Sequence, residues 1–451
     1  MPEPQGDRVQ SRSLFHLFAQ RRFLPFFITQ FLGALNDNLF KNALLVIVVS
    51  GAVAGSDSNT NFITNLAAGL FILPYFLFST TAGQLADRYD KALLIRRIKI
   101  AEIILMVAGC YALWRADINL MLGILFALGV QSAFFGPIKY AIIPQHLSAD
   151  ELLAGNAQVG MGTFVSILVG TLIGGWLVTA DQGPMYVGLL ATLFAVIGWL
   201  SSRHIPNAPA TSAAQQGTLA LNPLTVARGN LKLARKNPTV FYCIIAISWF
   251  WLYGGSFLTQ VPNYAVTVLQ GHPTLISILL SAFIVGVAIG SLLCHRLSKG
   301  QVEPGLVPIG GLGLSVFAVD LFFTSGLYQT ANADLSAVLP LTFIALTDGI
   351  HILLDLMFIG MFGGMLVVPL YSMIQQRTED NTRARVLSVN NIINAIFMVI
   401  GALLGMLFLS ILGWSIPQFF LAVALMNAVF LSAIFALDKI FIERVMAWVS
   451  K

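Results

Sequence analysis

Three ionisable side chains lie inside long apolar runs of this sequence, and these are the first candidates for chemistry. Asp37 is followed four residues later by Lys41, and Lys139 comes two residues after Pro137 in another apolar run. A carboxylate can bind a cationic group or carry a proton, and an ammonium group can bind a phosphate. Because a charge buried among apolar side chains is costly unless it is paired, each of the three is a candidate binding residue.

The neighbours of these charges leave two interpretations open. Asp37 lies between Asn36 and Asn38, about 21 Å along a helix that begins at the start of its apolar run. The polar side chains could bind a ligand, or Asp37 and Lys41, at positions i and i+4 of a helix, could form a purely structural ion pair. Lys139 could likewise bind a phosphate or simply extend to the surface from a helix end.

The composition requires a lipid environment. Of the 451 residues, 57% are hydrophobic and only 10% are charged, and the mean hydropathy is +0.82, whereas a soluble protein carries about 25% charged residues. The apolar runs are continuous over about 20 residues, which suits spanning helices rather than the alternating strands of a barrel. The sequence therefore predicts an all-α membrane protein and excludes a soluble enzyme.

The cysteines and histidines indicate no cofactor. Cys110, Cys243 and Cys294 lie in or beside apolar runs, where cysteine acts as a small hydrophobic side chain. No His/Cys cluster has metal-ligand spacing, so we expect neither a disulfide framework nor a bound metal or other cofactor.

Twelve apolar windows predict twelve spans. They lie near 24–50, 61–82, 93–114, 118–142, 156–179, 184–202, 239–268, 273–294, 304–327, 351–374, 386–411 and 416–437. The apolar segment 336–347 is too short to cross a bilayer, and we expect it to form a lateral or re-entrant helix in a loop.

The basic residues support this count. With a cytoplasmic N-terminus and twelve spans, all of the 25 Lys and Arg residues except Lys41, Arg115 and Lys139 lie on the cytoplasmic side. Such asymmetry is the positive-inside rule, and a thirteenth span would destroy it. We therefore expect both termini in the cytoplasm, and we attribute the basic excess to topology and contact with anionic lipids rather than to nucleic acid.

The chain divides into two predicted halves. Residues 1–203 and 239–451 each hold six spans, and the second half ends in a short cytoplasmic tail. The intervening 204–238 begins with a polar stretch rich in Pro, Ala and Gln and continues with basic residues at helical spacing. This second part is typical of an amphipathic helix on the inner membrane surface.

A weak internal repeat relates the halves. "FFGPIKYAIIPQ" closes the fourth span and "VVPLYSMIQQ" closes the tenth, so that Pro137 aligns with Pro369 and Lys139 with Tyr371. Parallel repeats of this kind relate the two halves of duplicated transporters. The unequal pair of Lys139 and Tyr371 indicates where the two halves differ in charge.

The loop between the second and third spans carries a recognisable motif. In "GQLADRYDKALLIRR", the positions of Gly83, Asp87, Arg88 and Lys91 match the loop signature of the major facilitator superfamily, although Asp90 stands where glycine is usual. Glycine allows helices to approach closely, and Asp87 could cap a helix or pair with an arginine of the other half. The resemblance implies that these four residues form a cytoplasmic gate; the alternative is an ordinary basic turn.

A closer resemblance extends along nearly the whole chain. "FLGALNDNLFKNAL", "FFGPIKYAIIP" and "GGMLVVPLYSMIQQR" are similar to the bacterial lysophospholipid transporter family, which has an Asp-Asn pair in span one and Pro-x-Lys-Tyr at the end of span four. This resemblance implies a flippase of the bacterial inner membrane. It would move lysophosphatidylethanolamine and lysophosphatidylglycerol from the outer to the inner leaflet for reacylation. An acyltransferase/acyl-carrier-protein synthetase is the implied functional partner, and we expect the transporter itself to be a monomer.

The predicted substrate-binding residues combine the charges with the repeat. They are Asp37, Asn38, Lys41, Lys139, Asn36, Tyr140, Tyr371 and Asn390. One departure concerns span seven, "WFWLYGGSFLTQVPNYA", which lacks the basic residue that we would expect in relatives. The alternative hypothesis is a proton-coupled antiporter of drugs or small solutes that uses Asp37 as its proton carrier.

Overall fold

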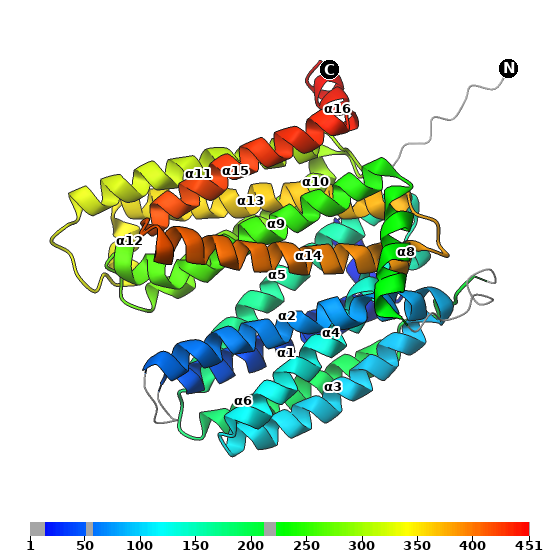
Figure 1. Cartoon of the computed structure of the whole chain (residues 1–451), viewed down its shortest axis with the longest axis horizontal. Helices are drawn as coiled ribbons and strands as arrows, with labels where there is room; N and C mark the ends of the chain where they lie inside the picture. Colours follow the sequence, from blue (N-terminus) through cyan, green and yellow to red (C-terminus); the bar gives the residue numbers. More distant parts are fainter. Residues whose placement is uncertain (1–13, 51–56, 212–221, 451) are drawn as a thin grey trace.

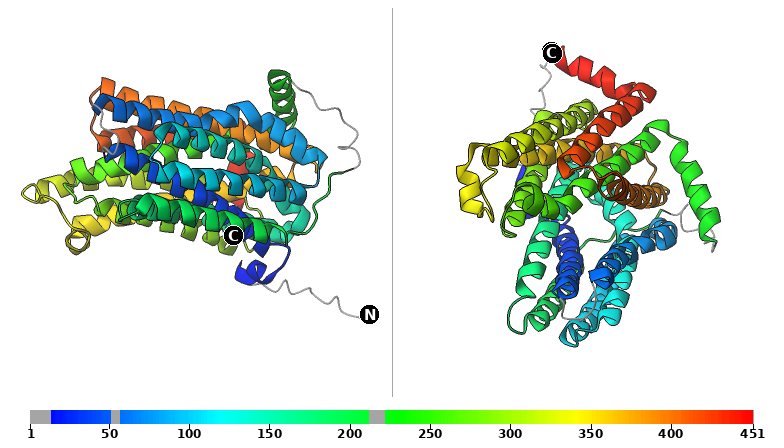
Figure 2. Two further views of the ribbon diagram at one scale, coloured as in Figure 1. Left: turned by 90° about the horizontal axis from the view of Figure 1, so that it is seen from below. Right: turned by 60° about the vertical axis from the view of Figure 1, so that its left-hand side comes forward.

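The computed structural model describes residues 14–50, 57–211 and 222–450, and the regular structure in these ranges is helical. Twelve long helices run roughly along one direction (Figures 1 and 2). They are α1 (Leu24–Val49), α2 (Asp57–Arg88), α3 (Lys91–Trp114), α4 (Ile118–His146), α5 (Leu152–Leu177), α6 (Gly183–Ser202), α9 (Pro238–Asn263), α10 (Leu275–Leu297), α11 (Leu306–Ala331), α13 (Thr347–Gln376), α14 (Arg383–Gly405) and α15 (Ile416–Leu437).

Shorter elements connect or extend these helices. They are η1 (Leu14–Ala19), η2 (Ala149–Glu151), α8 (Pro223–Arg235), η3 (Tyr264–Val268), α12 (Pro340–Ala345), η4 (Met406–Ile411) and α16 (Ile440–Val449). The segment 336–347 thus forms only the six-residue helix α12, which cannot cross a bilayer.

Eleven of the long helices within the described ranges are apolar enough to cross a membrane by composition alone. The twelfth, α3, has the necessary length of 24 residues, about 36 Å, but its first half is charged. Several of those charges are held internally: Arg96 donates to the carbonyl of Ile205 at 2.9 Å, and Lys99 pairs with Glu102 at 2.5 Å. Internal pairing explains how α3 can take its place among the spans, as the twelve-helix fold requires.

The helices form two bundles that lie side by side in Figure 1. In this view α1, α2, α3, α4 and α6 lie in the lower part and α9 to α15 in the upper part, while α5 runs obliquely between them. The boundaries at 1–203, 204–238 and 239–451 remain a prediction, and residues 212–221 of the linker lie outside the described ranges, as do Arg8, Arg12 and Lys451 of the charge census.

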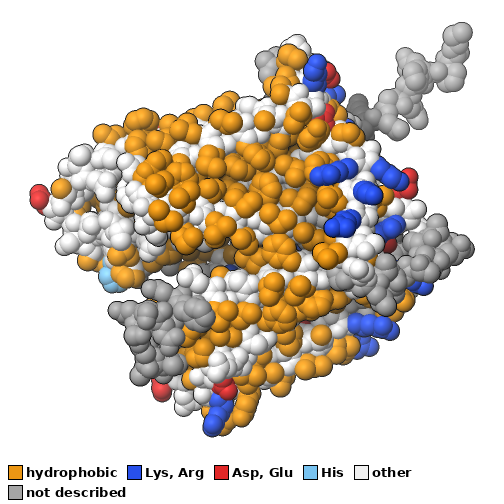
Figure 3. All heavy atoms as spheres, in the orientation of Figure 1, with side chains coloured by type: hydrophobic (Ala, Val, Ile, Leu, Met, Phe, Trp, Pro, Cys, Tyr) orange, Lys and Arg blue, Asp and Glu red, His pale blue; other side chains and the backbone are white. Residues whose placement is uncertain are grey.

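The surface separates apolar and basic side chains. Figure 3 shows a broad hydrophobic band over the helices, with Lys and Arg gathered at one end. This is the end where α1 begins and where α2, α4 and α13 finish, and we call it the basic end.

Helix α8 is the amphipathic helix that the linker sequence predicts. Asn222 caps its first turn by accepting from the backbone N–H of Leu224 at 3.0 Å. Its apolar side packs against α2, α14 and α9, while Arg228 and Lys232 are exposed. It therefore covers the basic end where α2 meets α14, running across the long helices in Figure 1.

Helices α10 and α13 approach each other closely because glycines line their contact. A Cβ added at Gly290 would lie 1.8 Å from the carbonyl oxygen of Met361, and one added at Gly286 would lie 1.9 Å from that of Met357. Contact of backbones through small residues is a major source of helix association in lipid.

Candidate functional site

Asp37 has one oxygen bound and one without a partner. It lies 13 residues after Leu24, about 20 Å along α1, and is 8% exposed. Ser132 of α4 donates its hydroxyl to Oδ2 at 2.5 Å. The other oxygen, Oδ1, is buried and accepts no hydrogen bond from the described residues. Asp37 therefore retains an acceptor for a further donor.

Lys41 does not form the structural ion pair with Asp37 that its spacing allows. None of the ion pairs among the described residues joins the two side chains. Lys41 instead places its Nζ 5.8 Å from the centre of the Phe71 ring on α2, a cation–π contact. The carboxylate and the ammonium thus remain separate groups, about one helical turn apart.

Lys139 is held inside the first bundle. Its Nζ donates to the hydroxyl of Thr163 on α5 at 2.6 Å and lies 5.2 Å from the centre of the Tyr140 ring. Thr163 in turn donates to the side-chain oxygen of Gln30 on α1 at 3.1 Å. The lysine is 9% exposed, so the alternative in which it merely extends to the surface does not describe this structure.

Tyr140 and Tyr371 meet across the two bundles. Their rings stack with centres 3.9 Å apart and planes within 7°. Asn390 donates to the Tyr371 hydroxyl at 3.4 Å, and Gln375 donates to the Tyr140 carbonyl at 2.9 Å. The structure therefore brings these three predicted residues together near Lys139, although they come from three helices.

The two asparagines beside Asp37 point elsewhere. Asn36 is fully buried and donates to the Glu102 carboxylate at 3.0 Å, while Asn38 donates to the carbonyl of Ala34 in its own helix at 2.8 Å. Successive residues of a helix are about 100° apart, so neighbours in sequence cannot share one face. The structure does not bring Asn36 or Asn38 to the side chains of Asp37 and Lys139.

Asn36 belongs instead to a polar network inside the first bundle. Glu102 accepts from Lys99 at 2.5 Å and from Gln131 at 2.9 Å. Lys99 is therefore the ion-pair partner of Glu102, three residues away on the same helix.

Several polar residues near the charges were not predicted. Ser132 and Thr163 are hydroxyl side chains in apolar helices, a common and uninformative pattern. For Ser132 a signal existed, because it lies seven residues before Lys139 and therefore on the same face of α4.

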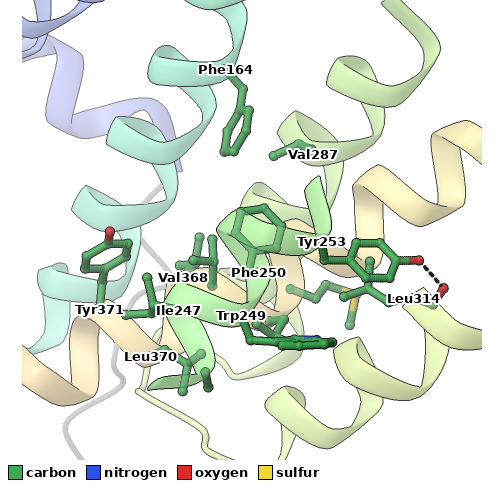
Figure 4. Close-up of a cluster of buried hydrophobic side chains, with 14 of the residues drawn as sticks. Phe164, Ile247, Trp249, Phe250, Tyr253, Val287, Leu314, Val368, Leu370 and Tyr371 are labelled. Carbon is green, nitrogen blue, oxygen red and sulfur yellow. Dashed lines mark hydrogen bonds between the residues drawn. The ribbon is translucent and has the colours of Figure 1, made fainter. Parts of the chain in front are cut away.

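Aromatic side chains continue the contact between the bundles. Figure 4 shows Phe164 of α5 extending toward Phe250 of α9, and the two ring centres are 6.0 Å apart. Trp251 stacks with Phe164 with ring centres 5.9 Å apart, and its buried Nε1 donates no hydrogen bond to the described residues. Tyr253 packs away from this contact and donates to the Leu314 carbonyl at 2.8 Å.

Asp87 joins the bundles at the basic end. Its carboxylate accepts from the backbone N–H groups of Ala384 at 2.9 Å and Arg385 at 3.1 Å, in the first turn of α14. The Arg385 side chain approaches the same carboxylate at 3.3 Å. Asp87 thus both caps a helix of the other bundle and pairs with its arginine, which are the two contacts that the sequence left open for it.

The other predicted gate residues surround this contact. A Cβ at Gly83 would lie 2.8 Å from the Cβ of Ser388, so only glycine allows α2 and α14 to lie this close. Arg88 is partly exposed at the end of α2, and Lys91 is buried at the start of α3. Asp90, the departure from the signature, caps α3 by accepting from Leu93 N–H at 2.9 Å.

The contacts between the bundles share one end of the molecule. Among the described residues, the hydrogen bonds, ion pair and ring contacts that join α1–α6 to α9–α15 come from within about 20 Å of the basic end. Helix α13 alone is about 45 Å long. The bundles are thus bound together at the basic end.

Replacing Asp87 by Asn is expected to loosen the basic end. An amide has one accepting oxygen and no charge, so the variant loses the ion pair and one hydrogen bond from a backbone N–H. This loss destabilises the joined state by about 1 kcal/mol, which shifts the equilibrium between joined and separated bundles roughly fivefold. The measurement is maleimide labelling of Ser372→Cys, a buried interface position, after replacement of the three native cysteines. Labelling should accelerate about fivefold, whereas Asp150→Asn, an exposed charge at the same end, should leave the rate unchanged. An unchanged rate for Asp87→Asn would refute the gate role.

Comparisons with known proteins agree with this architecture. The family model of the Major Facilitator Superfamily matches residues 26–352. Among solved structures, the chain resembles the human organic anion transporter MFSD10 with a TM-score of 0.68 and 14% identity, over 91% of this chain and 97% of that one. It also resembles the transporter FucP in its outward conformation with a TM-score of 0.65 and 15% identity, over 94% and 98% of the two chains.

Sequence relatives are more specific. The lysophospholipid transporter LplT of Serratia proteamaculans is 23% identical over 371 residues, 81% of this chain and 82% of its own length. The protein of that name from Salmonella paratyphi B is 24% identical over 369 residues, 80% and 81% of the two chains. The chain belongs to the major facilitator superfamily, as a multi-pass membrane transporter and not an enzyme, and within that superfamily it is similar to the bacterial lysophospholipid transporters.

Proposed function

We propose that this protein moves lysophospholipids from the outer to the inner leaflet of the bacterial inner membrane by alternating access. The observation that carries the proposal is that Asp37, Lys41 and Lys139 lie on helices of the first bundle and form no ion pair among the described residues. In addition, Asp37 Oδ1 accepts no hydrogen bond from those residues. The printed name of the relatives from Serratia and Salmonella supports the same substrate class.

The charges suit a lipid headgroup that carries both signs. Asp37 and Lys41 are about 6 Å apart along α1, which suits an ammonium and a phosphate joined by two carbons. Lys139 lies about 10 Å closer to the basic end than Asp37 and offers a second phosphate contact deeper in the protein. Headgroup contacts of this kind must replace the hydration that the headgroup loses.

The second bundle would contribute uncharged polar groups to the proposed headgroup site. Asn390 and Trp251 each have a buried polar atom, Oδ1 and Nε1 respectively, that makes no hydrogen bond with the described residues. Span seven carries no basic residue, so its phosphate contact is replaced in this proposal by the indole N–H of Trp251, a donor without charge.

The distribution of basic residues supports the proposed direction of transport. Lys and Arg concentrate on cytoplasmic loops, so we assign the basic end and both termini to the cytoplasm. The bundles are joined at that end, and a substrate would therefore enter from the outer leaflet. Reacylation after transport would fall to an acyltransferase/acyl-carrier-protein synthetase, and we propose a monomer as the transporting unit.

A proton-coupled antiporter of drugs or small solutes is the second candidate. It is favoured by the unpartnered Oδ1 of Asp37, which could carry a proton instead of binding an ammonium group. The two candidates differ in their substrate, and only the antiporter requires that the substrate drive a proton flux.

Uptake of labelled lysophosphatidylethanolamine tests the lipid proposal. Spheroplasts from cells that lack their own lysophospholipid transporter should accumulate the lipid only when this protein is expressed. The matched control is the same cell expressing the Asp37→Asn variant at equal level. Equal uptake with and without the protein would refute the lipid function, and proton flux driven by a drug in the same membranes would favour the antiporter.

A further inference from the structure

A second polar cluster lies outside the region of Asp37 and Lys139. It combines Asp320 of α11 with His351 and Asp355 of α13. His351 Nε2 lies 3.0 Å from Asp320 Oδ2 and 3.9 Å from Asp355 Oδ1, and the ligand atoms of all three residues lie within 4.8 Å of one another. The cluster thus contains two carboxylates and one imidazole.

The Asp355 carboxylate is buried with an oxygen that has no partner. Its side chain is 1% exposed, and Oδ2 accepts no hydrogen bond from the described residues. The ion pairs of the described residues connect neither Asp320 nor Asp355 to a lysine or arginine. A buried carboxylate without a cation is costly, and His351 can offset at most one of the two negative charges, and only when it is protonated. An added cation would therefore stabilise the cluster.

The apolar surroundings of the cluster increase its need for a compensating positive charge. On α11, the exposed side chains on the same helical face as Asp320 are apolar: Val316, Phe323 and Leu327. Within a spanning helix such side chains face lipid, where two neighbouring carboxylates cannot both remain charged without compensation.

We propose that Asp320, His351 and Asp355 form a binding site for a divalent transition-metal ion, with Zn²⁺ as its best representative. Zinc takes imidazole nitrogen and carboxylate oxygen at about 2.0–2.2 Å in a tetrahedron, which places neighbouring ligand atoms roughly 3.3 Å apart. The separations of 3.0 and 3.9 Å lie on either side of that value, so small side-chain rotations would complete the site. The 2+ charge of the ion balances the negative charges of both carboxylates.

The ion can reach the cluster. Asp320 and His351 are 44% and 47% exposed, so the described residues leave the fourth position of the tetrahedron uncovered. Along α13, His351 is about 6 Å and Asp355 about 12 Å from the end opposite the basic end. Magnesium and calcium prefer six or more oxygen ligands, so two carboxylates and one imidazole would bind them weakly. A bound ion would connect α11 to α13 within the second bundle, independently of the proposed lipid function.

The test is calorimetric titration of the purified, detergent-solubilised protein with ZnCl₂, after removal of any polyhistidine tag. We expect one zinc ion per chain and a raised thermal unfolding temperature, with no effect of equal MgCl₂. Asp320→Asn and His351→Ala, both at partly exposed positions, should each weaken zinc binding at least about tenfold by removing one of three ligands.

His272→Ala is the matched control, because His272 is an exposed histidine at the same end of the molecule, bonded to Thr274 at 2.9 Å. It should bind zinc as the unmodified protein does. Absence of zinc binding by the unmodified protein would overturn the proposal and leave a proton shared by the two carboxylates as the compensating charge. Zinc binding that survives both cluster substitutions, or that His272→Ala removes, would overturn it equally.

Discussion

Asp37→Asn and Lys139→Ala are each expected to reduce lysophospholipid uptake by about 10- to 100-fold while the protein still inserts in the membrane. The estimate follows from the loss of a hydrogen bond to a charged group, about 1.5–3 kcal/mol. Asp37 would lose its charge while keeping an oxygen for the Ser132 hydroxyl, and Lys139 would lose its whole ammonium group. Uptake of labelled lipid per membrane-inserted protein is the measurement.

The control for these variants is Asp334→Asn, which removes an exposed carboxylate from the loop after α11. It should transport at the unmodified rate. If Asp37→Asn and Lys139→Ala also transport at that rate, both residues are structural and the candidate substrate site is misplaced. If Asp37→Asn alone fails, and fails for drug-driven proton flux as well, the antiporter hypothesis gains support.

Gly290→Ala is expected to destabilise the second bundle strongly. The added methyl group would lie 1.8 Å from the carbonyl oxygen of Met361, so α10 and α13 would have to move apart by more than 1 Å. Overpacking of this kind costs about 1–3 kcal/mol, which lowers the Tm by roughly 2–12 °C for a bundle of this size. Thermal unfolding of the detergent-solubilised protein, followed by size-exclusion chromatography, measures the effect.

Gly326→Ala provides the same substitution where space is available. Gly326 lies in α11, and a Cβ there would meet no atom within 4 Å. Because alanine favours helix more than glycine, this control should keep or slightly raise the Tm. Equal Tm values for Gly290→Ala and Gly326→Ala would show that the contact between α10 and α13 tolerates an added methyl group.

The spanning helices could be predicted from the sequence because lipid imposes a single requirement on all of them. A run of about 20 apolar residues must form a helix in a bilayer, whatever its neighbours are. The same reasoning identified α8 from the spacing of its basic residues and rejected 336–347 as a span. Helix α3 is the exception in composition, since its charges are tolerated through pairs such as Lys99 with Glu102 that form only after folding.

The candidate site was less accessible to sequence reasoning. Two interpretations stood open for both Lys41 and Lys139, because spacing gives the distance along a helix but not which other helix lies opposite. The structure separated Lys41 from Asp37 and bound Lys139 to Thr163. It also turned Asn36 toward Glu102, because adjacent residues face different directions on a helix.

By itself, the sequence determined that this is a membrane protein, how many helices cross the bilayer, and which charges lie at depth, since hydropathy and charge asymmetry are properties of single segments. Only the tertiary structure decided which side chains contact one another. Asp87 meets Arg385 some 300 positions further along the chain, and Asp320 meets His351 and Asp355 from a different helix. Such contacts depend on how helices are rotated and packed against each other, and packing of helix faces is set by the whole bundle rather than by any local pattern.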